Sequence, residues 1–223
     1  MTVILMLATF VIFLIAERVI NKHEVPVLAK EAREGVAPRL QPAMVAGYKV
    51  PENLRYHQGH TWALSESPNL VRVGIDDFAA KLIGAAEAVQ TPTRGQWVRQ
   101  GQKVFAFRHK GELVELVSPI EGTIADVNDK LAKNPEMAID DNYGDGWLVT
   151  VTAPDAKTNY RNLMGGTLAR WFTEEAATRL RTKIPTLATA AATMHDGGEA
   201  HVDLSKEIPA DKYAETVNEF FLG

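Results

Sequence analysis

Residues 103–127 read KVFAFRHKGELVELVSPIEGTIADV, and this stretch decides the fold. It holds two runs rich in strand-forming residues, Lys103–Phe107 and Glu112–Val117, and a turn that begins after the second run. In this turn Pro119 fixes its own φ and Gly122 permits a positive φ, so the chain can reverse its direction. The stretch therefore predicts short β-strands that are joined by tight turns.

The same pattern extends outward on both sides of this stretch. Runs such as Leu70–Ile75 and Trp147–Val151 recur about every ten to fifteen residues, as the strands of a sandwich or flattened barrel do. Asp76–Ile83 interrupts them with a short helix signal, because its carboxylates fall in the first turn. We therefore expect a mainly β fold with some α, whose β-domain covers residues 56–157.

Short motifs in this region keep the order and spacing of the glycine cleavage system H-protein family, which the chain resembles from about Tyr56 to Glu175. The motifs are His60-Thr61-Trp62, Val73–Ala79 (VGIDDFA), Gly95–Gly101 (GQWVRQG), Ser118–Ile124 (SPIEGTI), Asn134–Glu136 (NPE) and Tyr143–Leu148 (YGDGWL). The resemblance implies a flattened β-barrel of the biotinyl/lipoyl-domain type. Trp62, Trp97 and Trp147 are then expected to fill its small core.

The resemblance also implies a carrier whose lipoate is attached to a lysine at a hairpin tip. Counting back from the turn proline, Pro119, the place of that lysine is taken by Gly111, and Lys110 comes one residue earlier. In a strand, a shift of one residue turns a side chain to the opposite face. Arg108 and His109 also replace the acidic and small residues that the family has there. We therefore expect no lipoate and no other cofactor, with lipoylation of Lys110 as the alternative.

The N-terminal residues Met1–Ala16, MTVILMLATFVIFLIA, carry no charge. At about 1.5 Å per residue they give about 24 Å of helix, and residues 17–20 extend it toward the width of a bilayer. A cleaved signal peptide is the other interpretation, but it would carry a basic region before its apolar run. We therefore predict a single transmembrane helix over residues 1–20.

The charges that follow this segment predict its orientation. Basic residues lie after it and none lies before it: Arg18, Lys22, Lys30, Arg33 and Arg39. By the positive-inside rule, the N-terminus lies outside and the bulk of the chain lies on the cytoplasmic side of the inner membrane.

The remaining segments are expected to flank the β-domain. Residues 21–55 contain scattered prolines and no regular period, which is typical of an extended tether. Residues 158–223 are expected to be a helical extension and tail, with an apolar stripe of Leu163, Leu168, Trp171 and Phe172 and a further helix from Thr173 to about Lys183. The apolar end, Phe220-Phe221-Leu222, is expected to dock on a partner or on the domain itself, or else to stay disordered.

Composition and motifs argue against several other functions. A net charge of −4 over 223 residues does not fit a nucleic-acid-binding protein, and the absence of cysteine excludes disulfides, thiolate metal sites and cysteine nucleophiles. His57 and His60 have no third ligand nearby, His195 and His201 flank a glycine-rich loop, and the acidic run at 140–145 lacks the spacing of a calcium loop. The sequence has no phosphate-binding loop and no nucleophile elbow. We therefore expect neither a metal site nor a catalytic residue.

Together these features predict a non-catalytic accessory subunit. It would be anchored in the lipid bilayer by residues 1–20 and would stabilise a larger integral membrane complex, photosynthetic or respiratory, from its cytoplasmic face. A membrane-tethered lipoyl carrier that uses Lys110 is the first alternative, and a regulatory or ligand-binding module is the second.

Overall fold

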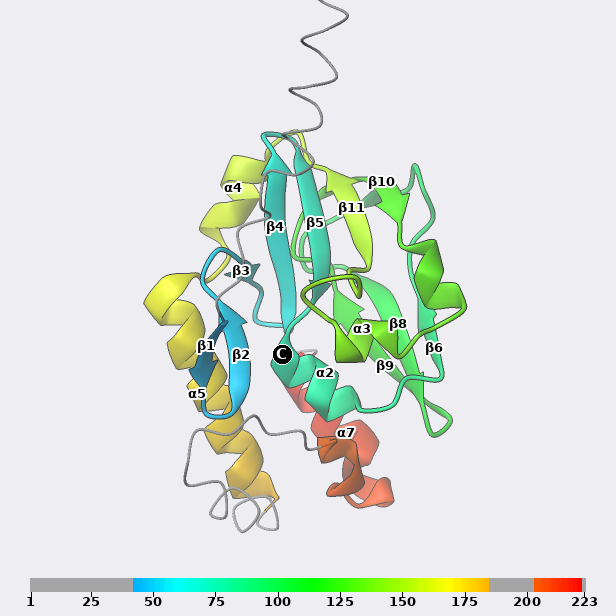
Figure 1. The fold of residues 1–223 in the computed structure, drawn as a ribbon, viewed down its shortest axis with the longest axis vertical. Helices are drawn as coiled ribbons and strands as arrows, with labels where there is room; N and C mark the ends of the chain where they lie inside the picture. The colour runs from blue at the N-terminus through cyan, green and yellow to red at the C-terminus, as the bar shows by residue number, and fades with distance from the viewer. Residues whose placement is uncertain (1–41, 185–202, 222–223) are drawn as a thin grey trace, which may run out of the picture. The chain divides into compact units, whose positions relative to one another are not determined.

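A computed structural model describes residues 42–184 and 203–221 of the chain, and Figure 1 shows its ribbon. The strands are β1 (Pro42–Val45), β2 (Tyr48–Pro51), β3 (Arg55–Tyr56), β4 (Thr61–Ser67), β5 (Leu70–Ile75), β6 (Ala88–Gln90), β7 (Trp97–Val98), β8 (Lys103–His109), β9 (Glu112–Val117), β10 (Gly122–Val127) and β11 (Val149–Thr152). The α-helices are α2 (Asp77–Ile83), α3 (Met137–Asp140), α4 (Ala156–Arg161), α5 (Gly166–Lys183) and α7 (Ala210–Phe221), and two 3₁₀-helices are η1 (Asp129–Ala132) and η2 (Leu204–Lys206).

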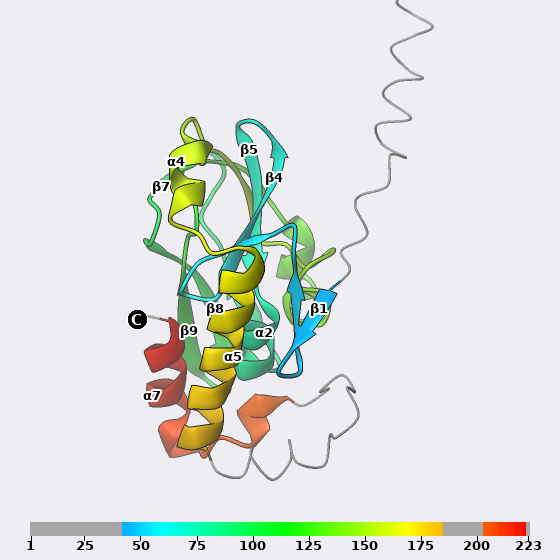
Figure 2. The ribbon, with the colours of Figure 1, turned by 90° about the vertical axis from the view of Figure 1, so that its left-hand side faces the viewer.

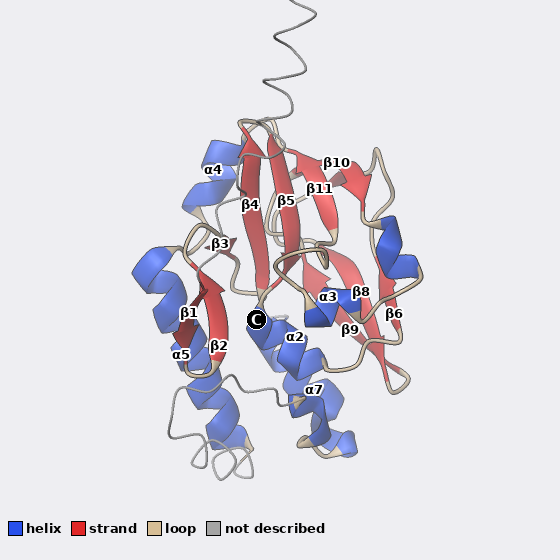
Figure 3. Ribbon diagram, viewed as in Figure 1, coloured by secondary structure: helices blue, strands red, loops and turns tan. Residues whose placement is uncertain are grey.

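Two sheets form the centre of the domain, as the red strands of Figure 3 show. The larger sheet has six strands in the order β3-β4-β5-β11-β10-β7, and the smaller has three in the order β6-β8-β9. One hydrophobic core joins them, because buried residues of the larger sheet, such as Val73 and Val151, belong to the same cluster as Phe105 and Leu116 of the smaller sheet. The predicted fold of mixed β and α, a sandwich of the lipoyl-domain type, is thus confirmed.

Most of the predicted local elements are also confirmed. The runs at 70–75 and 112–117 are β5 and β9, and the helix signal at 76–83 is α2. Asp76 caps this helix, since its Oδ1 accepts a hydrogen bond of 2.8 Å from the backbone N–H of Ala79. The capped helix buries Phe78 and Leu82 almost completely.

The expectation of an extended tether over residues 21–55 is wrong for its last part. Residues 42–51 form the hairpin of β1 and β2, whose strands pair from Pro42↔Pro51 to Val45↔Tyr48. Ala46 and Gly47 make the two-residue turn with φ values of 52° and 92°, and two positive φ values are what a type I′ turn requires. Residues 21–41 lie outside the described residues.

The helical stripe predicted before residue 173 is also corrected. One continuous helix, α5, runs from Gly166 to Lys183. It buries a face of small residues and one leucine, namely Ala169, Thr173, Ala176, Ala177 and Leu180. Because this face lies against the domain, Leu168 and Trp171 point away from it and are 54% and 58% exposed.

The C-terminal segment docks on its own domain. In α7, Phe220 and Phe221 are buried, and the Phe220 ring lies 5.2 Å from that of Phe78 in α2. Figures 1 and 2 both show α7 beside β9 at the end of the smaller sheet. The helical extension is therefore not a separate domain, because α5 and α7 contribute to the same core as the sheets.

The three tryptophans expected in the core have different environments. Trp62 is buried and donates its indole N–H to the carbonyl of Asn142 at 3.1 Å, whereas Trp147 is only partly buried. Trp97 is 49% exposed, which corrects the prediction for this residue. In the short edge strand β7 the side chain of Val98 points into the core, so that of Trp97 points to solvent.

No helix within residues 42–184 and 203–221 is long and apolar enough to cross a membrane. The transmembrane helix predicted over residues 1–20 lies outside the described residues.

Candidate functional site: the tip of the β8–β9 hairpin

The candidate site is the two-residue turn between β8 and β9. The strands pair up to His109↔Glu112, so Lys110 and Gly111 alone make the turn. Their φ values are 49° and 83°, and two positive φ values again fit a type I′ turn. The Lys110 side chain is exposed and carries a primary amine beyond the end of the hairpin.

Contacts from a distant part of the chain hold this turn in place. The carboxylate of Glu87 accepts a hydrogen bond of 3.0 Å from the backbone N–H of Lys110, and the N–H of Glu87 donates to the carbonyl of Arg108 at 2.9 Å. The ring of His109 lies 2.6 Å, through Nδ1, from the carbonyl of Ala85. Because a carbonyl only accepts, Nδ1 of His109 is the donor in this contact. The tip is therefore fixed on one side by residues 85–87.

The C-terminal helix also packs against the base of the hairpin turn. The buried His109 ring lies 5.1 Å from the ring of Tyr213 in α7, and the hydroxyl of Tyr213 donates to the carbonyl of Ile83 at 3.1 Å. Burial raises the pKa of Tyr213 well above its usual value, with smaller contributions from Asp203 and Glu112. His109 Nε2 is buried and has no hydrogen-bond partner. The contact between His109 and Tyr213 at the base of the turn is thus buried and largely apolar.

This geometry corrects one step of the sequence argument about Lys110. That argument treated the one-residue shift from Gly111 as a change of strand face. Neither residue lies in a strand, because both belong to the turn, so alternation of side chains does not apply to them. A lysine at position 111 would be strained, since φ there is 83°. Lys110 is therefore the lysine that the hairpin presents, and the expectation that it carries no lipoate stays a prediction.

Glu87 and Tyr213 were missed by the sequence analysis. Glu87 lies 23 residues before Lys110 in the sequence, and Tyr213 lies in a separate helix. No local motif marks either residue. The amphipathic pattern of residues 210–222 indicated that the tail docks, but not that it docks beside the hairpin.

The buried pair of His60 and Asp76 has a structural role. His60 Nδ1 lies 2.8 Å from Asp76 Oδ2, and the ring is stacked on Phe78 and lies near Phe172 and Phe221. Only 2% of His60 is exposed, so a substrate has no access to it. Asp76 meanwhile caps α2 with its other oxygen. The pair connects the β3–β4 turn to this helix.

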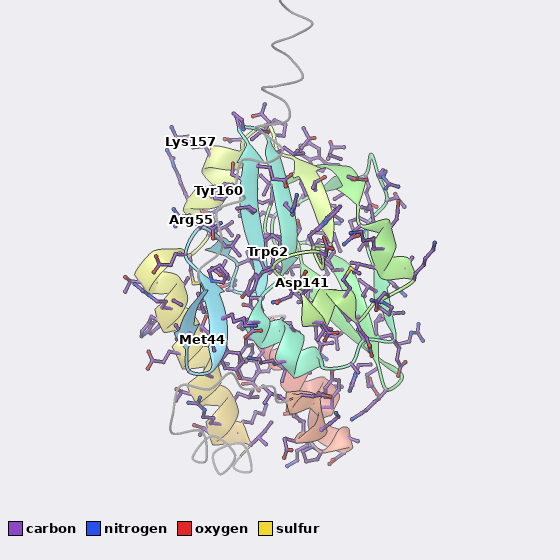
Figure 4. All side chains as sticks on the ribbon, viewed as in Figure 1. Met44, Arg55, Trp62, Asp141, Lys157 and Tyr160 are labelled. Atoms are coloured by element: carbon purple, nitrogen blue, oxygen red, sulfur yellow. The ribbon has the colours of Figure 1, made fainter. Side chains whose placement is uncertain are left out.

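The remaining histidine and acidic residues singled out from the sequence make local hydrogen bonds where the structure describes them. His57 accepts a hydrogen bond of 3.0 Å from the N–H of Gly59 through Nδ1, and burial lowers its pKa. Asp141 accepts one of 2.6 Å from the N–H of Asp145 and so closes the turn in which it lies (Figure 4). Within the described part of the chain, no three potential metal ligands lie together. His195 and His201 lie outside it.

Comparisons with known proteins point to one family. The family model described as glycine cleavage H-protein matches residues 54–176. The glycine cleavage system H protein of Anaeromyxobacter sp. (strain K) is 35% identical over 127 residues, which cover 57% of this chain and 98% of that protein. That of Coprothermobacter proteolyticus is 35% identical over 107 residues, or 48% of this chain and 84% of that protein.

A solved structure, the H protein of Mycobacterium marinum, is 28% identical and covers 47% of this chain and 87% of that chain, with a TM-score of 0.44.

The described domain is thus of the lipoyl-domain class, and its β8–β9 hairpin presents a lysine. More narrowly, the chain belongs to the glycine cleavage H-protein family, whose members carry lipoate and are carriers rather than catalysts. The family match ends at residue 176, so the helix that packs beside the hairpin, α7, lies outside it.

Proposed function

We propose that this protein is a non-catalytic, non-lipoylated member of the H-protein family that serves as an accessory subunit of an integral membrane complex. Residues 1–20 anchor it in the inner membrane with the N-terminus outside, and the domain lies on the cytoplasmic side. Its partners are membrane subunits of a photosynthetic or respiratory assembly.

The observation that carries the loss of the carrier role is the environment of Lys110. A lipoate ligase has to read the residues beside the lysine as well as the amine. Here a basic residue, Arg108, lies two residues before Lys110, and the His109 ring is buried against Tyr213 of a helix outside the family match. The amine of Lys110 itself is exposed, so the amine fits lipoate while its surroundings do not fit the ligase.

The anchor rests on the sequence of the N-terminal segment. Its first 16 residues carry no charge, and five basic residues follow within residues 17–41. The added hairpin β1–β2 and the helix α7 lie outside the family match on either side of the carrier domain. Such additions suit a subunit that makes contacts which a free carrier does not need.

A membrane-tethered lipoyl carrier that uses Lys110 is the second candidate. It is favoured by one observation, the position of Lys110 at an exposed hairpin tip whose backbone is held by Glu87. A turn whose backbone is held in place and whose lysine amine is exposed would suit the attachment of a lipoyl group that moves between partner enzymes.

Mass spectrometry of the intact protein separates the two candidates. The full chain is isolated from lipoate-replete cells that also express a lipoylated H protein as the positive control. We expect the unmodified mass for this chain and the lipoyl increment for the control. A lipoyl increment that Lys110→Arg abolishes would establish the carrier instead.

Purification in mild detergent tests the assembly. The chain is tagged after Gly223 and the proteins bound to it are identified and counted. We expect polytopic membrane subunits in fixed proportion to the chain. Recovery of the other glycine cleavage enzymes in their place would contradict an accessory role.

A further inference from the structure

The C-terminal helix α7 runs along β9 for the whole length of that strand. Near the start of β9, the ring of Tyr213 lies against that of His109, the residue before the turn. At the end of β9, a Cβ at position 59 would meet both Val117 and the carbonyl oxygen of Phe221, so these two residues lie close together. Figures 1 and 2 show the helix and the strand side by side. The helix therefore accompanies the hairpin from its turn to its far end.

Two kinds of contact hold α7 in this position. Five of its residues are no more than 5% exposed, namely Tyr213, Thr216, Val217, Phe220 and Phe221. On another side of the helix, Glu219 forms ion pairs with Arg179 and Lys183 of α5. The family match ends at residue 176, so the helix and the basic residues that pair with it both lie outside the match.

A helix in this position takes up space that an enzyme needs. An α-helix with its side chains is about 10–12 Å across. An enzyme that modifies a lysine at a hairpin tip has to place its active site around the turn and to contact the strands that lead to it. Along β9 this space is filled by α7. The amine of Lys110 is thus exposed to a small molecule, whereas one flank of its hairpin is closed to a protein.

The charges near the turn do not by themselves account for an unmodified Lys110. Arg108 is basic, but the carboxylate of Glu87 lies at the turn and accepts a hydrogen bond of 3.0 Å from the backbone N–H of Lys110. Glu112 follows the turn and pairs across the hairpin with His109. Two acidic residues therefore lie at the tip together with Arg108. The feature that distinguishes this hairpin is the helix beside it.

We propose that α7 blocks the attachment of lipoate to Lys110, and that the hairpin becomes a substrate of lipoate ligase when α7 leaves β9. This inference rests on the proposed function, in which the intact chain carries no lipoate. In the blocked reaction, lipoate and ATP first give lipoyl-adenylate and pyrophosphate. Nζ of Lys110 then forms an amide with the lipoyl carboxyl carbon, the amine gives up a proton and AMP leaves. The chain supplies the amine, and the ligase brings lipoate and ATP.

Two neighbouring residues of α7 give a matched pair of variants. Val217 is 1% exposed, whereas Asn218 is exposed. Val217→Asp and Asn218→Asp add the same charge, but only the first places it in the buried contact, where an unpaired carboxylate is costly. Val217→Asp should therefore undock α7, and Asn218→Asp should leave it in place.

Three measurements are made on each full-length protein in mild detergent. Mass spectrometry follows Lys110 during incubation with purified lipoate ligase, lipoate and ATP, with a lipoylated H protein as the positive control. Hydrogen exchange follows the amides of residues 210–221 and reports whether α7 is docked. Acetylation of Lys110 by a small succinimidyl ester measures the reactivity of the amine, which should be equal in all the proteins.

We expect Lys110 to be lipoylated roughly tenfold or more faster in Val217→Asp than in the natural chain or in Asn218→Asp, because the rate follows the fraction of molecules with α7 undocked. Val217→Asp that loses protection of α7 and keeps Lys110 unmodified would overturn this inference and leave the proposed function intact. Equal lipoylation of the two variants would also overturn it. Rapid lipoylation of the natural chain would overturn the inference and the non-lipoylated role together.

A second variant covers the case in which Val217→Asp does not fold or keeps α7 docked. Tyr213→Ala removes only the ring beside His109 and leaves Phe220 and Phe221 in the core. Lipoylation should again be faster than in the natural chain, with unchanged acetylation. A folded Tyr213→Ala protein with no gain in lipoylation would contradict the block.

Discussion

Lys110 has a backbone conformation that suits asparagine better than lysine. Its φ of 49° lies in the left-handed region, which costs an ordinary L-residue roughly 1–2 kcal/mol, whereas asparagine and glycine adopt it readily. We therefore predict that Lys110→Asn raises the free energy of unfolding by about 1 kcal/mol, because Asn-Gly is the preferred pair in this turn. Thermal or urea unfolding measures the change.

The control is Lys133→Asn. Lys133 is also exposed, but its φ is −100°, so asparagine gains nothing there. If both substitutions change stability equally, the turn is not of the type described.

Gly74 is required because the indole ring of Trp62 lies against its backbone. A Cβ at position 74 would overlap three atoms of this ring, which is 1% exposed and so cannot move aside. We expect Gly74→Ala to destabilise the protein by roughly 1–3 kcal/mol, the usual result of overpacking a core. The measurement is the midpoint of chemical denaturation.

A double variant distinguishes overpacking from a simple loss of backbone freedom. Phe is smaller than Trp, so Trp62→Phe should restore part of the stability that Gly74→Ala removes. The two changes would then be less than additive. Full additivity would show that the ring and the glycine do not interact.

At the scale of elements, α7 lies outside the family match and packs against the β8–β9 hairpin. Phe221 is 1% exposed and its ring lies 5.8 Å from that of His60, while Tyr213 of the same helix covers His109. We predict that Phe221→Ala lowers the free energy of unfolding by about 3–5 kcal/mol, as truncation of a buried phenylalanine does. Equilibrium denaturation gives this value.

Leu168→Ala serves as the control for this prediction, and both variants are unfolded in the same detergent solution. Leu168 is 54% exposed, so its truncation should change the stability by no more than about 0.5 kcal/mol. Equal and small effects of the two substitutions would show that α7 does not dock on the domain.

The elements also show where sequence reasoning succeeded and failed. Strands β5 and β9 were predictable, since each is a run of β-branched or apolar residues between turn residues. The β1–β2 hairpin was missed because its turn is Ala46-Gly47, and alanine at a positive φ gives no turn signal. The exposed side of α5 was taken for its buried side, because large apolar residues were assumed to be buried although alanines fill the contact.

At the scale of the whole molecule, the family and its sheets could be predicted from the sequence. The contacts that surround the base of the β8–β9 hairpin could not. The motifs that mark the family are local turns and packing residues, each readable in a few positions. The site around Lys110, in contrast, is made by residue 87 and by a helix that starts at residue 210. Contacts over such distances leave no periodic signal in the sequence, so they became known only from the folded chain.

One property of the whole molecule is that all five of its tyrosines have raised pKa values, namely Tyr48, Tyr56, Tyr143, Tyr160 and Tyr213. In each case burial is the main cause, and it raises the pKa of Tyr160 to about 12. Between pH 10 and the raised values, the folded protein keeps protons that the unfolded chain has released. The stabilisation is therefore complete below about pH 10 and is lost as the pH rises through the folded-state pKa values.

We predict that the protein unfolds cooperatively in alkali. The near-ultraviolet absorbance of phenolate should appear together with the loss of circular dichroism, and not before it. Tyr160→Phe provides the comparison, because the buried hydroxyl of Tyr160 has no hydrogen-bond partner and its removal should cost little at neutral pH. Above pH 10 this variant should lose stability less steeply than the natural chain, by up to about 1.4 kcal/mol per pH unit. Phenolate that forms near pH 10 in a protein with unchanged circular dichroism would show that the tyrosines are open to water.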